Sequence, residues 1–217
     1  MTPVVVSPLT KDQIAARIAA DIAPGSYVNL GIGLPTLVAD HLPAASGITL
    51  HTENGMLGMG PAATGDEVDP DLVNAGKVPV VELPGAAYFH QADSFAMMRG
   101  GHLDLCVLGA FQVSVSGDLA NWSTGAPGAV PAVGGAMDLA IGARRTVVMM
   151  TLFAKDGSPK LVRNCTLPLT GLRCTSRIYT DLAVFDVGAD GASVVETFGI
   201  EFDELSERLG LHLERSR

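Results

Sequence analysis

One acidic residue, Glu53, lies within a run of small and apolar residues, HTENGMLGMGP (51–61). Asn54-Gly55 favours a tight turn, and most single acids beside such a dipeptide face solvent. The alternative is a carboxylate directed at a bulky ligand, because Gly55 and Gly58 carry no side chain that would keep a ligand from the backbone. The run by itself leaves both interpretations open.

Two glycine-containing turns could bind the oxygen atoms of a ligand. Gly31 and Gly33 follow an expected strand and open an expected helix, where backbone N–H groups can hold a phosphate. They do not form a GxGxxG fingerprint, so a turn without a ligand is the simpler interpretation. Gly134-Gly135-Ala136 precedes a short expected helix, and successive N–H groups there could form an oxyanion hole if a nucleophile lay close by.

Other polar residues give weaker signals for chemistry. His51 shares a strand face with Glu53, which suits either an acid–base pair or a structural histidine. Ser94 lacks a GxSxG context, so we expect 92–104 to be a capped helix whose polar groups satisfy one another. Asn121-Trp122 is expected to pack rather than to stack on a ligand. The five histidines show no metal-binding spacing, and no metal is expected.

The composition excludes several classes of protein. The net charge is −9 and no stretch is rich in lysine or arginine, which argues against nucleic-acid binding. Charged residues make up only 17% of the chain, which hints at a subunit interface. The three cysteines fit no zinc pattern and favour reduced thiols in the cytoplasm. The N-terminus lacks the features of a signal peptide, and no apolar run suits a membrane span.

The order of the expected elements indicates an α/β fold. Residues 11–22 form a helix, 27–33 a strand with a glycine turn, 34–42 a helix and 48–54 a strand, which is the pattern of parallel βαβ units. Ligands of such sheets bind beyond the carboxyl ends of the strands, where the glycine turn and Glu53 would meet. Hairpins are expected late in the chain, and 1–217 is expected to be a single domain with an open sheet.

Long segments, taken in order, resemble the B (beta) subunits of 3-oxoacid CoA-transferases. They cover most of residues 30–187, and the segments within 88–143 are most similar to subunits that act on 3-oxoadipate. The matching segments are GIGLPTLVADHLP, HTENGMLGMGP, ADSFAMMRGGHLDLCVLGAFQVSVSGDLANW, AVGGAMDLAIGARR and KDGSPKLVRNCTLPLTGLRCTSRIYTDLAVFDV.

The resemblance implies a reaction and a site. It implies that Glu53 is the nucleophile in moving CoA from succinyl-CoA to 3-oxoadipate, with no cofactor because the CoA thioester is a substrate. It also implies a partner, the CoA-transferase A (alpha) subunit, in an A2B2 heterotetramer with the site between subunits. Backbone N–H groups near the acyl carbonyl are expected from Gly134, Gly135 and Ala136. The residues expected beside CoA are Gly31, Gly33, Asn54, Gly55 and Gly58.

Several alternatives remain at the level of sequence. The acceptor could be acetoacetate or another short-chain acid instead of 3-oxoadipate. A CoA-ester ring hydrolase, a sugar-phosphate isomerase and a non-catalytic module are further options on related folds. Arg163, Arg173 and Arg177 are candidates for binding the second carboxylate of 3-oxoadipate, because a guanidinium can hold a carboxylate through two hydrogen bonds. A surface or interface role suits each of them equally well.

Overall fold

The computed structural model describes residues 7–74, 76–126, 128 and 132–216. The prediction that the N-terminal segment is not a signal peptide falls partly on residues 1–6, which lie outside the described residues. Among the described helices, none has the length and apolar character needed to cross a membrane.

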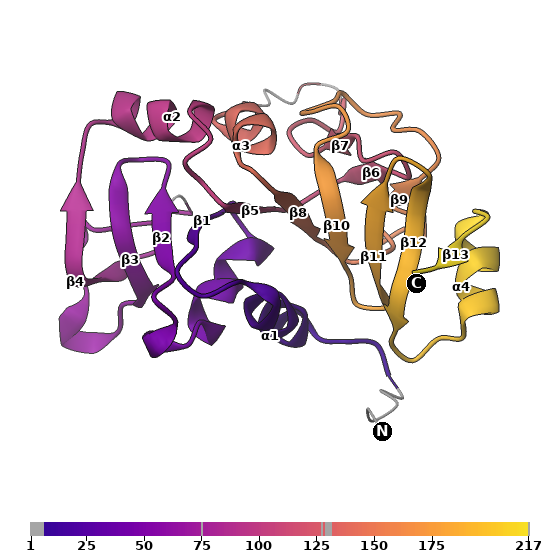
Figure 1. The fold of residues 1–217 in the computed structure, drawn as a ribbon, viewed down its shortest axis with the longest axis horizontal. Coiled ribbons are helices and arrows are strands. Elements are labelled where there is room, and N and C mark those ends of the chain that lie inside the picture. The colour runs from indigo at the N-terminus through magenta and orange to yellow at the C-terminus, as the bar shows by residue number, and fades with distance from the viewer. Residues whose placement is uncertain (1–6, 75, 127, 129–131, 217) are drawn as a thin grey trace.

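Ten strands of the described residues form one open, mixed sheet in the order β13-β12-β11-β10-β8-β5-β1-β2-β3-β4 (Figure 1). The centre of the sheet is parallel, because β1 pairs with β2 and β5, and β8 pairs with β5 and β10. The predicted α/β class with an open sheet is confirmed. The central strands are β1 (Tyr27–Leu30), β2 (Thr49–Thr52), β5 (Leu105–Leu108), β8 (Thr146–Met149) and β10 (Thr175–Tyr179).

Antiparallel strands extend both edges of this sheet. The predicted late hairpin is confirmed as β11 and β12, which pair antiparallel beside β10. The strand β3 on the other edge is not predicted, because Gly58, Gly60 and Pro61 argue against a strand. β3 accommodates them because its pairing with β4 shifts in register on both sides of Met59. These antiparallel strands are β3 (Met56–Ala62), β4 (Val80–Tyr88), β11 (Ala183–Gly188) and β12 (Gly191–Thr197). The short strand β13 (Glu214–Arg215) pairs parallel with β12 at the end of the sheet.

Helices cover both faces of the sheet (Figure 1). Side chains of β5 alternate between two hydrophobic clusters: Cys106 and Leu108 belong to one, Leu105 and Val107 to the other. Helices α2, α3 and α4 pack on the first face, and α1 with the 3-10 helix η1 packs on the second. The helices are α1 (Lys11–Asp21), η1 (Leu34–His41), η2 (Ala44–Ser46), η3 (Gly65–Glu67), α2 (Gln91–Arg99), α3 (Ala136–Gly142) and α4 (Phe202–Leu209).

The first helix begins as its sequence predicts. The Thr10 side chain accepts a hydrogen bond from the Gln13 backbone, and the Gln13 side chain accepts one from the Thr10 backbone, which completes the capping box. The helix expected over 34–42 is instead a 3-10 helix. Gly33 leads into it with φ of +87°, and the backbone and side chain of Thr36 both donate to the Gly33 carbonyl, which tightens the first turn.

A small second sheet lies beyond the end of β5. Its order is β7-β6-β9, with β6 (Gln112–Ser114) between β7 (Leu119–Ala120) and β9 (Leu161–Val162). β6 pairs antiparallel with β7 and parallel with β9. Residues 109–111 connect β5 to this sheet, so the sheet and its loops flank the carboxyl end of the parallel strands. This is the edge at which ligands of open α/β sheets bind.

Candidate active site

Glu53 lies in the tight turn that joins β2 to β3. The backbone N–H of Gly55 donates to the Thr52 carbonyl at 3.2 Å, and Gly55 has a φ of +113°, which favours glycine. The Asn-Gly turn predicted from the sequence is therefore present. Glu53 also stands just beyond the carboxyl end of β2, as predicted, so the turn and the ligand-facing position coincide.

The Glu53 carboxylate rests on the backbone of Gly135. A methyl group built on Gly135 would lie 2.6 Å from Oε2 and 2.7 Å from Cδ of Glu53, so only glycine leaves room for this contact. A methyl group on Gly134 would lie 4.0 Å from Oε1. The fold thus brings together the two motifs, distant in sequence, that were expected to share one site.

Among the three amides of this turn, that of Gly135 is directed at the carboxylate. The N–H of Ala136 donates to the Val133 carbonyl at 3.2 Å, whereas the backbone amide of Gly135 lies near enough to Glu53 to lower the pKa of its carboxyl group. Gly135 is also the N-cap residue of α3, whose N-terminal end carries a partial positive charge. The negative carboxylate therefore lies at a favourable end of the helix.

Burial raises the pKa of Glu53, whose side chain is half-buried. The Gly135 hydrogen bond acts in the opposite direction, and the negative charge of Asp138 raises the pKa further. Asp138 itself forms an ion pair with Arg99 at 2.6 Å, which joins α3 to α2. The carboxylate is poorly hydrated, and this makes its ionised form more reactive toward an electrophile than it would be in water.

A buried chain of hydrogen bonds supports the backbone next to Glu53. The amide nitrogen of Asn29 contacts His51 Nδ1 at 3.0 Å, and His51 Nε2 contacts Ser94 Oγ at 2.9 Å. Ser94 Oγ in turn donates to the Thr52 carbonyl at 3.1 Å. Because an amide nitrogen can only donate, His51 accepts at Nδ1 and carries its proton on Nε2. The chain links β1, β2 and α2, and it fixes the peptide group that joins Thr52 to Glu53.

His51 therefore serves as a neutral, structural residue. Its side chain is 2% exposed, and burial lowers its pKa to about 4. Both ring nitrogens bond to Asn29 and Ser94, so the acid–base pair with Glu53 considered from the sequence is not formed.

The expectation that the polar groups of 92–104 satisfy one another is wrong. Ser94 bonds across to β2 and Arg99 pairs with Asp138, because α2 packs between the end of the sheet and α3. The predicted capped helix itself is present, and its N-cap is His90, whose Nδ1 accepts the N–H of Ala92 at 3.0 Å.

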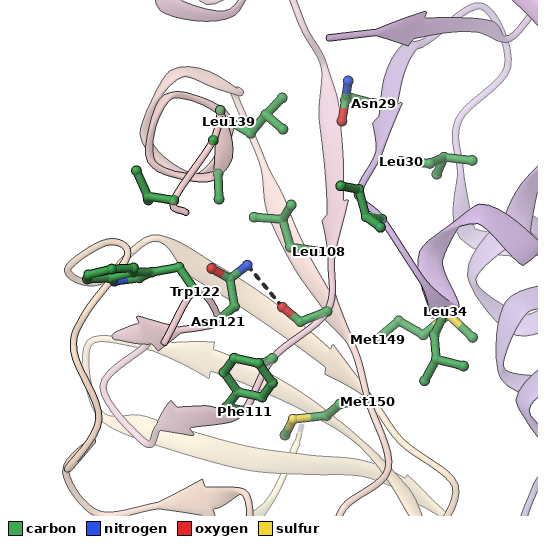
Figure 2. A pocket seen from close by; sticks show the side chains of 18 of the residues that line it. Asn29, Leu30, Leu34, Leu108, Phe111, Asn121, Trp122, Leu139, Met149 and Met150 are labelled. Carbon is green, nitrogen blue, oxygen red and sulfur yellow. Dashed lines mark hydrogen bonds between the residues drawn. The ribbon is translucent and has the colours of Figure 1, made fainter. Parts of the chain in front are cut away.

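A cavity of about 520 Å³ opens in front of Glu53. Figure 2 shows its largely apolar wall, with side chains such as Leu34, Leu108, Phe111 and Met150 around the hollow. Glu53 and Lys160 are the two charged residues on this wall, within the part of the chain that the structure describes. Such a site excludes water from much of a bound ligand and strengthens electrostatic interactions within it.

The structure places the predicted ligand-binding glycines in two groups. Gly31 and Gly134-Gly135-Ala136 line the cavity. Gly33 is the exposed N-cap of η1 and does not line it. The predictions that these residues contact CoA or the acyl group remain predictions.

The remaining predicted residues, Asn54, Gly55 and Gly58, face β4 and its flanking segments. Asn54 Nδ2 donates to the Val73 carbonyl at 3.1 Å. A methyl group on Gly55 would lie 2.2 Å from the Phe89 carbonyl oxygen, and one on Gly58 would lie 3.0 Å from Cα of Ala86. Close packing of backbones therefore explains why Gly55 and Gly58 must be glycines, even without a ligand nearby. That these residues contact CoA remains a prediction.

Three cavity residues lack a clear signal in the sequence. Asn29 is an ordinary strand residue there, and Lys160 follows a hairpin turn with no motif around it. Trp122 lines the cavity while its Nε1 donates to the Leu169 carbonyl at 3.2 Å, so it both packs and faces the hollow (Figure 2). The pairing of β1 with β2 brings Asn29 to the site, and the position of β9 brings Lys160 there.

The chain is similar to known CoA-transferase subunits along most of its length. The B subunit of 3-oxoadipate CoA-transferase from Pseudomonas putida is 61% identical over 94% of this chain and 96% of its own length. The subunit of the same name from Acinetobacter baylyi is 56% identical over 94% of this chain and 95% of its own. The crystal structure of an acyl-CoA transferase (YdiF) from Escherichia coli O157:H7 superposes with a TM-score of 0.73 at 20% identity. The match covers 99% of this chain and 43% of that longer one.

The family comparison covers the whole region that holds the site. The family described as Coenzyme A transferase matches residues 11–197, a span that includes Glu53, Gly135 and the cavity around them. Together with the identity to the two curated subunits over nearly the full chain, this match is decisive. The chain belongs to the coenzyme A transferase family.

Proposed function

We propose that the chain is the B (beta) subunit of an enzyme that transfers CoA from succinyl-CoA to 3-oxoadipate. The observation that carries the proposal is the contact of the Glu53 carboxylate with the Gly135 amide on the wall of a largely apolar cavity. The choice of 3-oxoadipate is supported by the names of the Pseudomonas putida and Acinetobacter baylyi relatives.

Glu53 acts as a covalent relay between the two acids. Its carboxylate attacks the thioester carbonyl of succinyl-CoA, and the C–S bond breaks to give a succinyl–glutamyl anhydride and CoA thiolate. The thiolate then attacks the glutamyl carbonyl, which forms an enzyme–CoA thioester and releases succinate. The same steps in reverse transfer CoA to 3-oxoadipate and regenerate the carboxylate, so the kinetics are ping-pong.

The Gly135 amide is suited to the steps that occur at the glutamyl carbonyl. When thiolate or carboxylate adds to that carbonyl, a glutamyl oxygen takes up the negative charge of the tetrahedral intermediate. The Gly135 amide already lies beside the Glu53 carboxylate, so it can stabilise this charge with little rearrangement. Loss of one such donor typically costs about 3 kcal/mol of transition-state stabilisation.

The apolar wall protects the intermediates of this relay. An anhydride and a thioester both hydrolyse if water reaches the glutamyl carbonyl, so the reaction needs a site with little water. Leu30, Leu34, Leu108 and Leu139 supply such a surface around the cavity. No metal or redox step enters the proposed scheme, in which the CoA thioester is a substrate.

The proposal includes a partner subunit. Both curated relatives are named as the B subunit of their enzyme, so we propose that this chain pairs with a CoA-transferase A subunit in an A2B2 assembly. The exposed Ile32 and Phe111, 67% and 41% accessible, lie beside the cavity and would be covered by such a partner. The free thiols of the three cysteines suit a reducing compartment such as the cytoplasm.

Steady-state kinetics of the assembled enzyme test the proposed function. The rates are measured while succinyl-CoA and 3-oxoadipate are varied together, with acetoacetate as a second acceptor. We expect parallel double-reciprocal plots and a higher kcat/KM for 3-oxoadipate than for acetoacetate. Intersecting plots would contradict the covalent relay, and a preference for acetoacetate would contradict the proposed acceptor.

A further inference from the structure

The cavity wall carries a single positive charge within the described residues, that of Lys160. Its one negative charge is that of Glu53, and the other side chains are apolar or uncharged. Lys160 has no place in the CoA relay described above. A lone cation in a largely apolar cavity therefore requires a separate explanation.

The backbone of Lys160 is firmly held at the start of β9. Its N–H donates to the Leu152 carbonyl at 2.9 Å, and its carbonyl accepts the N–H of Val113 at 2.8 Å. The next residue, Leu161, is fully buried in the hydrophobic cluster. Since consecutive side chains of an extended chain point to opposite sides, Lys160 is directed away from that cluster. It lies at the cavity, where the partly exposed Phe111 also lines the wall.

Lys160 is a partly buried residue and forms none of the ion pairs found among the described residues. Burial lowers its pKa, and the negative charge of Asp181 acts in the opposite direction. Asp181 uses Oδ1 to accept the N–H of Leu152 at 2.8 Å, so its carboxylate is partly engaged with the backbone. A lysine that is partly buried and has no ion pair within the described part of the chain has much to gain from a ligand carboxylate.

The arginines considered from the sequence are elsewhere. Arg177 pairs with Asp186 at 2.6 Å and with Asp21 at 3.4 Å. Arg163 lines a different hollow, next to the β11–β12 hairpin, and Arg173 is exposed with a φ of +48°. None of the three lines the cavity that contains Glu53.

We propose that Lys160 binds the distal carboxylate of dicarboxylic acyl groups while Glu53 exchanges CoA at the near carboxyl group. This inference rests on the proposed function, since succinyl and 3-oxoadipyl groups both end in a second carboxylate. The two acyl groups differ in length, so their distal carboxylates lie at different distances from Glu53. The flexible side chain of lysine can reach both positions, whereas the planar guanidinium of arginine is more restricted in geometry. Lys160 is thus a specificity-determining residue for dicarboxylates over monocarboxylates.

Binding of free acids to the assembled enzyme tests the proposal without any catalysis. Calorimetry compares succinate and 3-oxoadipate with butyrate, which has the length of succinate but one carboxylate. We expect Lys160→Met to weaken binding of both diacids by about 10- to 100-fold, the range of one charge-assisted hydrogen bond, and to leave butyrate binding unchanged. Lys155→Met is the matched control, because Lys155 is exposed in the adjacent hairpin turn, and it should change nothing.

The Lys160→Arg variant shows whether a loss of binding in Lys160→Met comes from the lost charge or from misfolding. It keeps the positive charge, and we expect it to retain diacid binding within about 10-fold of the wild-type enzyme. Equal binding of diacids by the Lys160→Met variant and the wild type would overturn the proposal. An equal loss for diacids and butyrate would also overturn it, since that pattern indicates general damage to the site.

Kinetics then separate the failure of this inference from the failure of the proposed function. If the wild type transfers CoA to 3-oxoadipate but Lys160→Met lowers kcat/KM equally for 3-oxoadipate and acetoacetate, the proposed function stands and Lys160 is not the selective residue. If the wild type transfers no CoA to 3-oxoadipate, the proposed acceptor is wrong. The difference between succinate and butyrate binding still decides the role of Lys160 in that case.

Discussion

The Glu53 carboxylate lies against the backbone of Gly135, close enough that a methyl group on Gly135 would come within 2.6 Å of Oε2. The first residue belongs to the turn after a parallel strand, and the second caps a helix that begins far along the chain. Their contact places a nucleophile and a backbone donor at one point of the cavity. Changes to this contact, or to the groups that support it, should therefore alter catalysis or stability in distinct ways.

Gly135→Ala should impair catalysis far more than folding. The added methyl group meets the end of the flexible Glu53 side chain, which can turn aside at small energetic cost but then leaves its position beside the amide. We expect kcat to fall by about 100-fold or more, as for loss of an oxyanion donor. Turnover and thermal unfolding are measured together.

The matched control for this variant is Gly188→Ala. A methyl group on Gly188 meets no atom within 4 Å, and this glycine does not have a positive φ. We expect turnover close to that of the wild type. Equal activities of the two variants would show that the contact between Glu53 and Gly135 has no catalytic role.

The rate of enzyme–CoA adduct formation should decrease as the solution is made acidic. The decrease should begin at a higher pH than it would if Glu53 had the pKa of an ordinary glutamate. Attack needs ionised Glu53, and burial followed by the charge of Asp138 raises its pKa above 4.5. Asp138→Asn removes one of these causes and releases the charge of Arg99, so both changes lower the pKa. We expect the acid limb of the pH–rate profile to move to lower pH in this variant. If the acid limb keeps its position or moves to higher pH, the effects assigned to Asp138 and Arg99 on the pKa of Glu53 are wrong.

His51 should make the chain less stable in mild acid. Its pKa is lowered from 6.5 to about 4 by burial, so the unfolded chain binds a proton between these pH values that the native chain does not. The free energy of unfolding therefore decreases as the pH falls through this window, by about 3 kcal/mol in total. Urea denaturation from pH 7 to pH 4 measures this loss.

The variant His51→Gln isolates the contribution of His51. Glutamine cannot titrate in this range, yet it can accept from Asn29 and donate to Ser94 as the neutral imidazole does. We expect its free energy of unfolding to decrease less between pH 7 and pH 4 than that of the wild type. Parallel pH dependence of the two proteins would mean that His51 is not held neutral in the native state.

Gly55→Ala should destabilise the fold. Gly55 has a φ of +113°, and a methyl group would lie 2.2 Å from the backbone oxygen of Phe89, which cannot move aside as a side chain can. We expect a loss of about 2–4 kcal/mol in the free energy of unfolding, the range for severe backbone strain. A variant of normal stability with a raised KM for succinyl-CoA would instead favour a ligand-contact role for this glycine.

The sequence predicts those parts of the fold that local patterns determine. The helix that begins at residue 11, the Asn-Gly turn after β2 and the late β11–β12 hairpin all have short-range signals, and the structure contains each of them. β3 is not predicted, because its glycines and proline argue against a strand. Only the two shifts in its register with β4 make it possible, and these depend on a distant part of the chain.

The residues of the site also fall into two groups, those that the sequence indicates and those that it does not. The Glu53 and Gly135 motifs are visible in the sequence as short segments with a resemblance to a known family, and the fold brings them into contact. Asn29 and Lys160 carry no local signal, since a buried asparagine on a strand and a lysine after a turn are common. The parallel pairing of β1 with β2, which the predicted βαβ unit contains, brings Asn29 to the cavity. The pairing of β9 with β6 brings Lys160 there, and the sequence does not reveal that pairing.

Mass spectrometry of the assembled enzyme after addition of succinyl-CoA tests the central claim most directly. We expect a CoA adduct on the peptide that contains Glu53, absent from the Glu53→Gln variant and discharged by 3-oxoadipate. The Glu53→Gln protein should still fold and pair with its partner subunit. An adduct on another residue, or normal turnover of Glu53→Gln without deamidation, would contradict the assignment of Glu53 as the nucleophile.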